Sequence, residues 1–370
     1  MTHPTTLEDP RREVRIFLAE QLALGAFRPS CDSWLSGFSA EFSRSLAERG
    51  WLGMTWPSRY GGHERSEVER FAVTEELLAA GAPVAAHWFA DRQVGPALLK
   101  HGTEDQRQSL LPAMARGECF VAIGLSEPDS GSDLASVRTT AAPVAGGWNV
   151  NGTKVWTSHA QHCQYMLTLL RTAPHDNLDR HTGLSQVLID LTSPGVSVRP
   201  IPLLDGHPHF NEVSLTDVFV PHEHLLGKEG AGWQQVISEL AYERSGPERI
   251  LSTFPLLAEV FQREHHADEF IGPLLAELMT LRHMSVGIAR QIERGSAPPV
   301  EAALVKDLGT QFENRVIEVS RLIAAVEPDV RSPDTLVRLL AEAVLHAPAF
   351  TLRGGTSEVL RGIVAKSVVR

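Results

Sequence analysis

Hydrophobic residues recur every three or four positions through residues 11–116, a spacing that places them on one face of an α-helix. Examples of this spacing are Val14, Phe17, Leu18, Phe71, Leu77 and Leu78. A run rich in glycine, proline and tryptophan at residues 50–62 predicts a packed loop between helices. Thr103, with Gln106 three residues later, is typical of a capping box at the start of a further helix. The first third of the chain is therefore predicted to be helical.

The hydrophobic period changes to that of β-strands between about residues 120 and 227. Short apolar runs bounded by Gly, Pro, Asn or Asp predict strands at residues 165–171, 186–191, 196–201 and 212–220. Two dipeptides, Gly146-Gly147 and Asn151-Gly152, favour two-residue hairpin turns between extended runs. We therefore predict a β-barrel or sandwich in the middle of the chain.

Helical spacing resumes after Gly230 and Gly232 and continues to the end of the chain, apart from a linker at residues 293–300. The order α, β, α predicts an α+β fold with three domains. We expect an N-terminal α-helical domain at residues 1–119, a middle β domain at 120–228, and a C-terminal α-helical domain, similar to a four-helix bundle, at 229–370.

The composition is that of an ordinary globular protein, because 43% of the 370 residues are hydrophobic and 21% are charged. The formal net charge of −11 argues against a nucleic-acid partner, since a phosphate backbone requires a basic surface. Cys31, Cys119 and Cys163 match neither a disulfide framework nor a zinc pattern, so we expect a reducing, cytoplasmic location. The first 22 residues resemble neither a secretory signal nor a transit peptide, and no apolar run approaches the roughly 18 to 20 residues that span a bilayer. We therefore expect no membrane association.

Neutral hydrogen-bonding side chains gather in residues 125–158, which begin with the turn LSEPDSGSD. Pro128 and Gly131 favour a tight backbone in this turn, which predicts a rigid loop. The hydroxyl groups belong to Ser126, Ser130, Ser132, Thr157 and Ser158, with Trp156 beside the last two. Such a set suits a polar planar ring better than a metal ion or a phosphate chain. The alternative is a serine-rich surface loop on a β-meander.

Five segments, in this order and on an α, β, α background, resemble the acyl-CoA dehydrogenase family over nearly the whole chain. They are GWLGMTWPSRYGG (50–62), GTEDQR…LLP…GE (102–118), LSEPDSGSD (125–133), NGTKVWTS (151–158) and LRGGTSEVLRGIVAK (352–366). The resemblance implies an FAD cofactor whose isoalloxazine ring lies between the middle domain and the C-terminal helices.

The family's motifs imply which residues contact the cofactor and the substrate. Ser126 matches a hydroxyl residue near the pyrimidine side of the flavin, and Ser158 matches one near N5; threonine is frequent at both positions, and serine retains the hydroxyl. The other residues implied on the cofactor side are Leu125, Trp156, Thr157, Thr356 and Glu358. Those implied on the substrate side are Ser132, Arg244, Gly354 and Gly355.

The family's reaction needs a carboxylate base to remove an α-proton while flavin N5 accepts a hydride from the β-carbon. Many members carry this base immediately before the Gly-Thr of the tail, where this chain has Gly354. A minority carry it on the helix after the β domain, where this chain has Glu243 followed by Arg244. We therefore predict Glu243 as the base, with Glu239 and Glu248 as weaker substitutes. The alternative is that Glu243 is a solvated partner of an arginine and that the chain is a catalytically silent subunit.

Many members also carry Arg-x-x-Phe-Gly and Gly-Gly-x-Gly motifs that hold the adenine half of FAD from a neighbouring subunit, and neither occurs here. Residues 262–266, QREHH, occupy the approximate place of the first motif. A homo-oligomer with altered adenine contacts and a heterotetramer with a related subunit both fit this departure.

The predicted function is FAD-dependent α,β-dehydrogenation of an acyl-CoA or acyl-carrier thioester, with an electron-transfer flavoprotein as the partner that reoxidises the flavin. The alternatives are an acyl-CoA oxidase, a carrier-protein-linked desaturase, and a flavin-poor subunit of a heteromeric dehydrogenase. No metal site is expected, because the histidine pairs His207/His209 and His222/His224 lie beside prolines at predicted strand ends, where we interpret them as polar loop residues.

Overall fold

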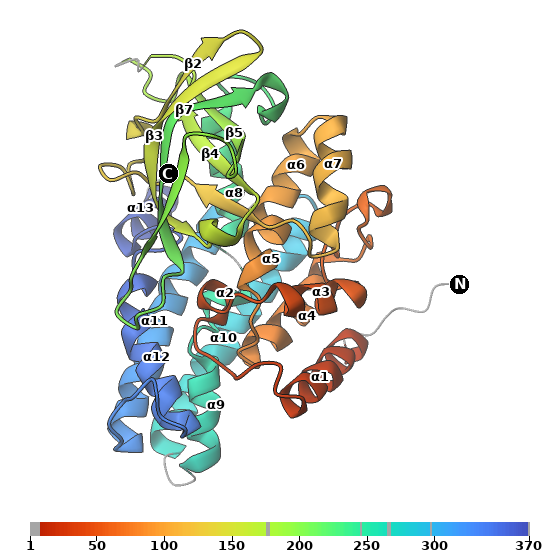
Figure 1. Ribbon diagram of the computed structural model, residues 1–370. Helices are drawn as coiled ribbons and strands as arrows, with labels where there is room; N and C mark the ends of the chain where they lie inside the picture. Colours follow the sequence, from red (N-terminus) through yellow and green to blue (C-terminus); the bar gives the residue numbers. More distant parts are fainter. Residues whose placement is uncertain (1–7, 175–177, 245, 265–267, 297, 369–370) are drawn as a thin grey trace. The chain divides into compact units, whose positions relative to one another are not determined.

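The chain forms two compact units, each built from stretches that are far apart in the sequence (Figure 1). The computed structural model describes residues 8–174, 178–244, 246–264, 268–296 and 298–368. The first unit, called the helical unit below, comprises Met1–Phe42, Arg65–Ala85 and Ala241–Arg370. The second, called the sheet unit, comprises Ser43–Glu64 and Ala86–Leu240. The three domain boundaries expected from the sequence stay predictions.

Long helices make up the helical unit. They are α1 (Glu8–Ala23), α4 (Glu67–Ala79), α9 (Phe254–Arg263), α10 (Asp268–Glu293), α11 (Pro299–Ala324), α12 (Thr335–Phe350) and α13 (Ser357–Val368), with the shorter α2 (Ser33–Ser36) and η6 (Pro247–Arg249). Helix α11 packs against α9, α10, α12 and α13, while α4 packs against both α1 and α10. The linker predicted at residues 293–300 is confirmed, because α10 ends at Glu293 and α11 begins at Pro299.

The sheet unit begins with helices that share a hydrophobic core with its sheet. The helices that lie wholly in this unit are α6 (Gly95–His101), α7 (Glu104–Ala115) and the short turns η1 (Ser58–Tyr60) and η2 (Ala90–Val94). Three other helices begin in one unit and end in the other: α3 (Ala40–Glu48), α5 (Ala85–Phe89) and α8 (Gly232–Glu243). The predicted capping box of α7 is confirmed. The Thr103 hydroxyl accepts from the Gln106 amide at 3.2 Å, and the Gln106 side chain accepts from the Thr103 amide at 3.0 Å. The predicted loop at residues 50–62 is confirmed apart from η1.

A curled seven-stranded sheet forms the rest of the unit. Its strands are β1 (Val121–Gly124), β2 (Thr140–Val144), β3 (Gly147–Ser158), β4 (Tyr165–Arg171), β5 (Leu184–Asp190), β6 (Val196–Ile201) and β7 (Phe210–Pro221). Their order is β1-β4-β2-β3-β7-β6, and β5 pairs with β4. The four strands predicted from the sequence are present as β4, β5, β6 and β7. Figure 1 shows the two longest strands, β3 and β7, running side by side in an antiparallel pair.

One of the two predicted hairpin turns is wrong. Gly146-Gly147 does connect the antiparallel strands β2 and β3, but Asn151-Gly152 lies inside β3, which continues to Ser158. Pairing with the whole of β7 overrides the local turn preference of this dipeptide. A Cβ on Gly152 would come within 2.3 Å of the Thr139 hydroxyl oxygen. The glycine is therefore needed for close approach of two backbones, not for a turn.

Asn151 also has a role within the sheet. Its side-chain amide donates to the Asp217 carboxylate at 3.0 Å, and its side-chain oxygen accepts from the Asp217 amide at 2.9 Å. Asp217 has a φ of 52° and lies where β7 has one residue more than β3, between the pairs Val150–Val218 and Gly152–Leu215. Asn151 therefore holds a β-bulge in the neighbouring strand.

Candidate functional site

Trp156 lies at a second β-bulge, this time in β3. Lys154 pairs with Val213 and Thr157 pairs with Asn211, so β3 advances three residues where β7 advances two. Trp156 accordingly has a φ of 59°, and its indole is 55% exposed. Such a φ is unusual for a residue with a large side chain and is maintained only when the surrounding structure enforces it. The bulge turns this aromatic ring out of the sheet.

The residue after this bulge, Thr157, has a buried hydroxyl group without a hydrogen-bond partner in the described part of the chain. Thr157 is fully buried, and its Oγ1 atom contacts no donor or acceptor at hydrogen-bonding distance within the described part of the chain. Its carbonyl is already used, because it accepts from the Asn211 side chain at 3.1 Å. Ser158 is also buried. A buried hydroxyl that lacks a partner often marks a place where a ligand or water binds, and here the preceding residue exposes its indole. This donor set fits the polar planar ring of a flavin.

Hydrogen bonds tie the LSEPDSGSD turn to the same place. The Val155 amide donates to the Ser126 carbonyl at 2.9 Å, which fixes Ser126 beside the bulge. Within the turn, the amides and carbonyls of Glu127 and Ser130 pair at 2.7 and 3.1 Å, and the Ser130 hydroxyl donates to the Asp133 carbonyl at 2.7 Å. These bonds would restrain the turn, and its rigidity stays a prediction.

A buried ion pair that the sequence analysis did not find locks this turn onto β3. Lys154 Nζ lies 2.7 Å from Glu127 Oε1 and also donates to the carbonyls of Leu169 at 2.6 Å and Leu125 at 3.3 Å. The Glu127 carboxylate accepts in addition from the backbone amides of Arg138 and Thr139. Leu125, Ser126, Trp156, Thr157 and Ser158 are therefore brought together by contacts within one unit.

The protonation of this pair follows from its surroundings. Burial lowers the pKa of Lys154 to about 8, although the nearby Glu127 charge opposes the shift. Burial alone would raise the pKa of Glu127, but the Lys154 charge and the accepted hydrogen bonds outweigh it and lower the pKa. Both groups are consequently charged at neutral pH. The alternation of strand residues gives no sign of such a pair, since the two partners are 27 positions apart.

In the helical unit, the turn that precedes α13 is held by cations. Arg244 Nε donates to the Gly354 carbonyl at 3.0 Å, and Lys306 Nζ donates to the carbonyls of Gly355 at 3.0 Å and Phe350 at 2.9 Å. Gly354 has a φ of 64°, and a Cβ built on it would lie 3.0 Å from both Cζ and Nη1 of Arg249. The position where many members of the family carry a glutamate is therefore next to a guanidinium group.

Arg249 belongs to a buried cluster of aromatic and charged groups under this turn. Its guanidinium lies 4.9 Å from the centre of the Trp34 ring, and that of Arg353 lies 4.8 Å from the same ring. Arg353 also pairs with Asp32. Burial raises the pKa of Glu313 to about 7 against the opposing charge of Arg353, which is 3.8 Å away. Because these groups are buried and contact one another, the turn has little freedom to move.

The remaining predicted site residues are placed as follows. Thr356 accepts a long hydrogen bond, 3.4 Å, from the Val359 amide, and exposed Glu358 has a lowered pKa because backbone and Thr356 hydroxyl groups donate to it. Ser132 is exposed on the LSEPDSGSD turn. Glu243 is the last residue of α8, and its side chain lies outside the described part of the chain.

The two weaker base candidates are both buried. The Gln186 side chain donates to Glu239 Oε2 at 3.3 Å in the sheet unit. Glu248 is 1% exposed, and its carbonyl accepts from the Ser252 hydroxyl in the helical unit. The predicted cofactor residues fall into two groups: Leu125 to Ser158 in the sheet unit, and Thr356 with Glu358 in the helical unit.

The histidines singled out by the sequence have structural contacts. His222 packs edge-on against Trp148 with ring centres 4.6 Å apart, and His224 Nδ1 lies 2.9 Å from the Leu188 carbonyl oxygen. In the stretch that replaces the family's adenine motif, Arg263 pairs with Asp334 at 2.8 Å, while residues 265–266 lie outside the described part. No helix among the described residues has the length and apolar character needed to cross a membrane.

Sequence comparisons match this chain to acyl-CoA dehydrogenases. Sequence profiles for the acyl-CoA dehydrogenase N-terminal domain and middle domain match residues 5–118 and 122–218. Acyl-CoA dehydrogenase IpdE1 of Mycobacterium tuberculosis is 32% identical, and the match covers 98% of this chain and 97% of that protein.

Two solved structures share the fold over the whole chain. The Tcur3481-Tcur3483 steroid ACAD matches with a TM-score of 0.86 and 26% identity, over 100% of this chain and 98% of the matched chain. The ChsE4-ChsE5 complex from Mycobacterium tuberculosis matches with a TM-score of 0.82 and 28% identity, over 100% and 98%. Both are complexes of two different proteins.

Proposed function

Because the chain belongs to the acyl-CoA dehydrogenase family, we propose that it oxidises the Cα–Cβ bond of an acyl thioester to the α,β-enoyl thioester with FAD as its cofactor. The observation that carries this proposal is the Thr157 hydroxyl, which is buried without a hydrogen-bond partner among the described residues and follows the exposed Trp156 in the chain. When bound, FAD would accept the β-hydride at N5. Ser126, Thr157 and Ser158 would hold the ring by hydrogen bonds, and Trp156 would cover it against water.

Glu243 is proposed as the base that takes the α-proton onto a carboxylate oxygen. Gly354 carries no side chain for this purpose, and its φ and the adjacent Arg249 both disfavour one. Support for Glu243 comes from its chain neighbour, since Arg244 Nε donates to the Gly354 carbonyl at 3.0 Å. Residue 243 therefore lies next to an arginine that contacts the family's usual base position. Exclusion of water by bound substrate would raise the pKa of such a carboxylate and make it a stronger base.

Arg244, Gly355 and Ser132 are proposed on the substrate side. Arg244 is expected from the resemblance at the nucleotide end of the thioester, but its hydrogen bond to the Gly354 carbonyl would instead place its charge close to the proposed base. The Gly355 amide is a backbone donor next to the same carbonyl. Ser132 is exposed at the end of the rigid turn and is free to donate or accept a hydrogen bond to the thioester.

The test is anaerobic reduction of the flavin by a panel of acyl-CoAs that differ in length, branching and ring content. We expect bleaching of the flavin absorbance by at least one of them. Glu243→Gln is expected to slow the reduction by about 10²–10⁴-fold, the usual effect of removing a general base. Glu229→Gln is the matched control, because Glu229 is exposed just before α8. Unchanged reduction in Glu243→Gln would overturn the assignment of the base.

A second candidate function is that of one subunit in a heteromeric acyl-CoA dehydrogenase. Two observations favour it: both solved structures described above are complexes of two proteins, and the chain lacks the family's adenine-binding motifs. A purified chain that is colourless alone and yellow after co-expression with a related subunit would support this candidate. Reoxidation by an electron-transfer flavoprotein in preference to oxygen would distinguish a dehydrogenase from an oxidase.

A further inference from the structure

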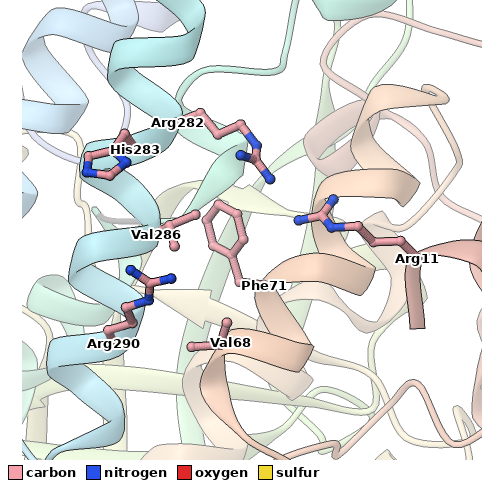
Figure 2. A pocket seen from close by; sticks show the side chains of 7 residues that line it. All are labelled: Arg11, Val68, Phe71, Arg282, His283, Val286 and Arg290. Carbon is pink, nitrogen blue, oxygen red and sulfur yellow. The ribbon is translucent and has the colours of Figure 1, made fainter. Parts of the chain in front are cut away.

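A basic hollow of about 370 Å³ lies in the helical unit, where α1, α4 and α10 meet. It is lined by Arg11, Val68, Phe71, Arg282, His283, Val286 and Arg290 (Figure 2). No residue predicted to bind cofactor or substrate is among them. Its volume is in the range of sites that hold small organic ligands.

Cations dominate this hollow. Glu75, which is 7% exposed, binds both Arg282 at 2.6 Å and Arg11 at 2.5 Å, and so holds the two guanidinium groups in place from behind. Glu76 binds Arg11 at 2.8 Å and Arg15 at 2.7 Å. The carboxylates of Glu75 and Glu76 are thus shared among three arginines, Arg11, Arg15 and Arg282. Arg290 is not one of them.

Arg290 adds a charge that those carboxylates do not neutralise. Its side chain is exposed and forms no ion pair or hydrogen bond with another residue of the described part of the chain. The hollow therefore carries a local positive excess in a protein whose net charge is −11. An unneutralised basic concavity in an acidic protein attracts anions.

The floor of the hollow is apolar. Figure 2 shows the Phe71 ring standing between the guanidinium groups of Arg282, Arg290 and Arg11, with Val68 and Val286 on either side of its base. A ligand that fits this surface needs both a multiply charged head for the guanidinium groups and an apolar body for the aromatic ring. A flat acidic protein surface would not fill a concavity of this kind.

We propose that the basic hollow binds a small organic phosphate whose apolar body lies on Phe71. A phosphate monoester offers three acceptor oxygens and carries nearly two negative charges at neutral pH, whereas a monocarboxylate offers two oxygens and one charge. The phosphate can therefore bind guanidinium groups from different helices at once and neutralise more of their charge. Arg282 and Arg11 are held in place by Glu75 and Glu76, and Arg290 closes the site from the next turns of α10.

The test is isothermal titration of the purified full-length protein with phenyl phosphate, inorganic phosphate and benzoate. Phenyl phosphate should bind at least about tenfold more tightly than either of the other two, because only it has both the dianion and the ring. Arg290→Gln should weaken phenyl phosphate binding at least about tenfold. Arg294→Gln is the matched control, since it removes the same charge just beyond the end of α10 from a residue that does not line the hollow.

Several outcomes would overturn the proposal. The first is that phenyl phosphate does not bind at concentrations on the order of 10 mM. The second is that Arg290→Gln and Arg294→Gln weaken phenyl phosphate binding equally, which would mean that the overall charge of the protein attracts the ligand. Displacement of phenyl phosphate by coenzyme A in equal measure in both variants would assign the binding to the proposed substrate site instead. Binding of a glutamate-rich peptide without binding of phenyl phosphate would indicate a protein-docking surface. Unchanged acyl-CoA reduction in Arg290→Gln is expected, because no residue proposed to bind cofactor or substrate lines the hollow.

Discussion

Restoring the family's usual base, by Gly354→Glu, is expected to destabilise the protein without restoring catalysis. A residue with a side chain at a φ of 64° costs about 1–2 kcal/mol. Its Cβ would also lie 3.0 Å from Cζ and Nη1 of Arg249, which is 2% exposed and stacked on Trp34. Forcing atoms into such a filled space costs about 1–3 kcal/mol. Together these effects predict a loss of about 2–5 kcal/mol in the free energy of unfolding.

A carboxylate at this position would also be a poor base. The adjacent Arg249 charge stabilises the ionised form and lowers the pKa of a neighbouring carboxyl group, which weakens its affinity for the α-proton. In the Glu243→Gln background, we therefore expect Gly354→Glu to leave the slow rate of flavin reduction unchanged.

Alanine variants separate the two causes of instability. Gly295 has a φ of 80° but nothing within 4 Å of a built Cβ, so Gly295→Ala measures the cost of the backbone conformation alone. Gly354→Ala adds the contact with Arg249, and urea denaturation of both variants gives the difference. If Gly354→Ala costs no more than Gly295→Ala, and Gly354→Glu rescues flavin reduction to within about tenfold of wild type, the reasoning about this position is refuted.

Three further predictions concern buried or strained groups. Lys154→Met should lower the free energy of unfolding by about 3–5 kcal/mol, because it leaves the Glu127 carboxylate buried without its partner. Adding Glu127→Gln should recover part of this loss, as measured by urea denaturation, and a double variant less stable than Lys154→Met would contradict the prediction. Trp156→Gly should change the free energy of unfolding by less than about 1 kcal/mol, since relief of the positive φ offsets the lost aromatic contact, yet should weaken FAD binding measured by fluorescence; unchanged FAD affinity would remove the indole from the proposed site. The pKa of Glu313 is raised to about 7, so the folded state binds its proton more tightly than the unfolded state, and up to about 3 kcal/mol of stability should be lost as the pH rises from 4.5 through 7. Glu313→Gln should abolish that loss, and an unchanged pH profile in this variant would assign the titration to another group.

Much of the fold could be predicted because each element has a local signal. The strands were recognised from alternating and apolar runs, and the start of α7 from Thr103 and Gln106, whose hydrogen bonds depend on residues three apart. The error at Asn151-Gly152 has the opposite cause. The dipeptide has the composition of a turn, but its conformation is decided by pairing with Asp217 and close approach to Thr139, which no local pattern contains.

The candidate site could be predicted only in part for the same reason. Thr157 and Trp156 were identified from their side-chain chemistry, yet the bulge that exposes one and buries the other depends on the register of β7. Lys154 pairs with Glu127, which is 27 positions away in the chain. Arg353 pairs with Asp32, which is 321 positions away. The basic hollow likewise assembles residues from three helices that the sequence separates widely.

The bulge at Trp156 has a consequence for how the chain can change in evolution. Since β3 has one residue more than β7 between Lys154 and Thr157, deleting that residue would leave every other pair of the two strands intact. A deletion elsewhere in β3 would instead exchange the buried and exposed faces of the strand beyond it. Trp156 is thus an insertion that the sheet does not require, and we expect selection to retain it only for as long as the protein binds its ligand there.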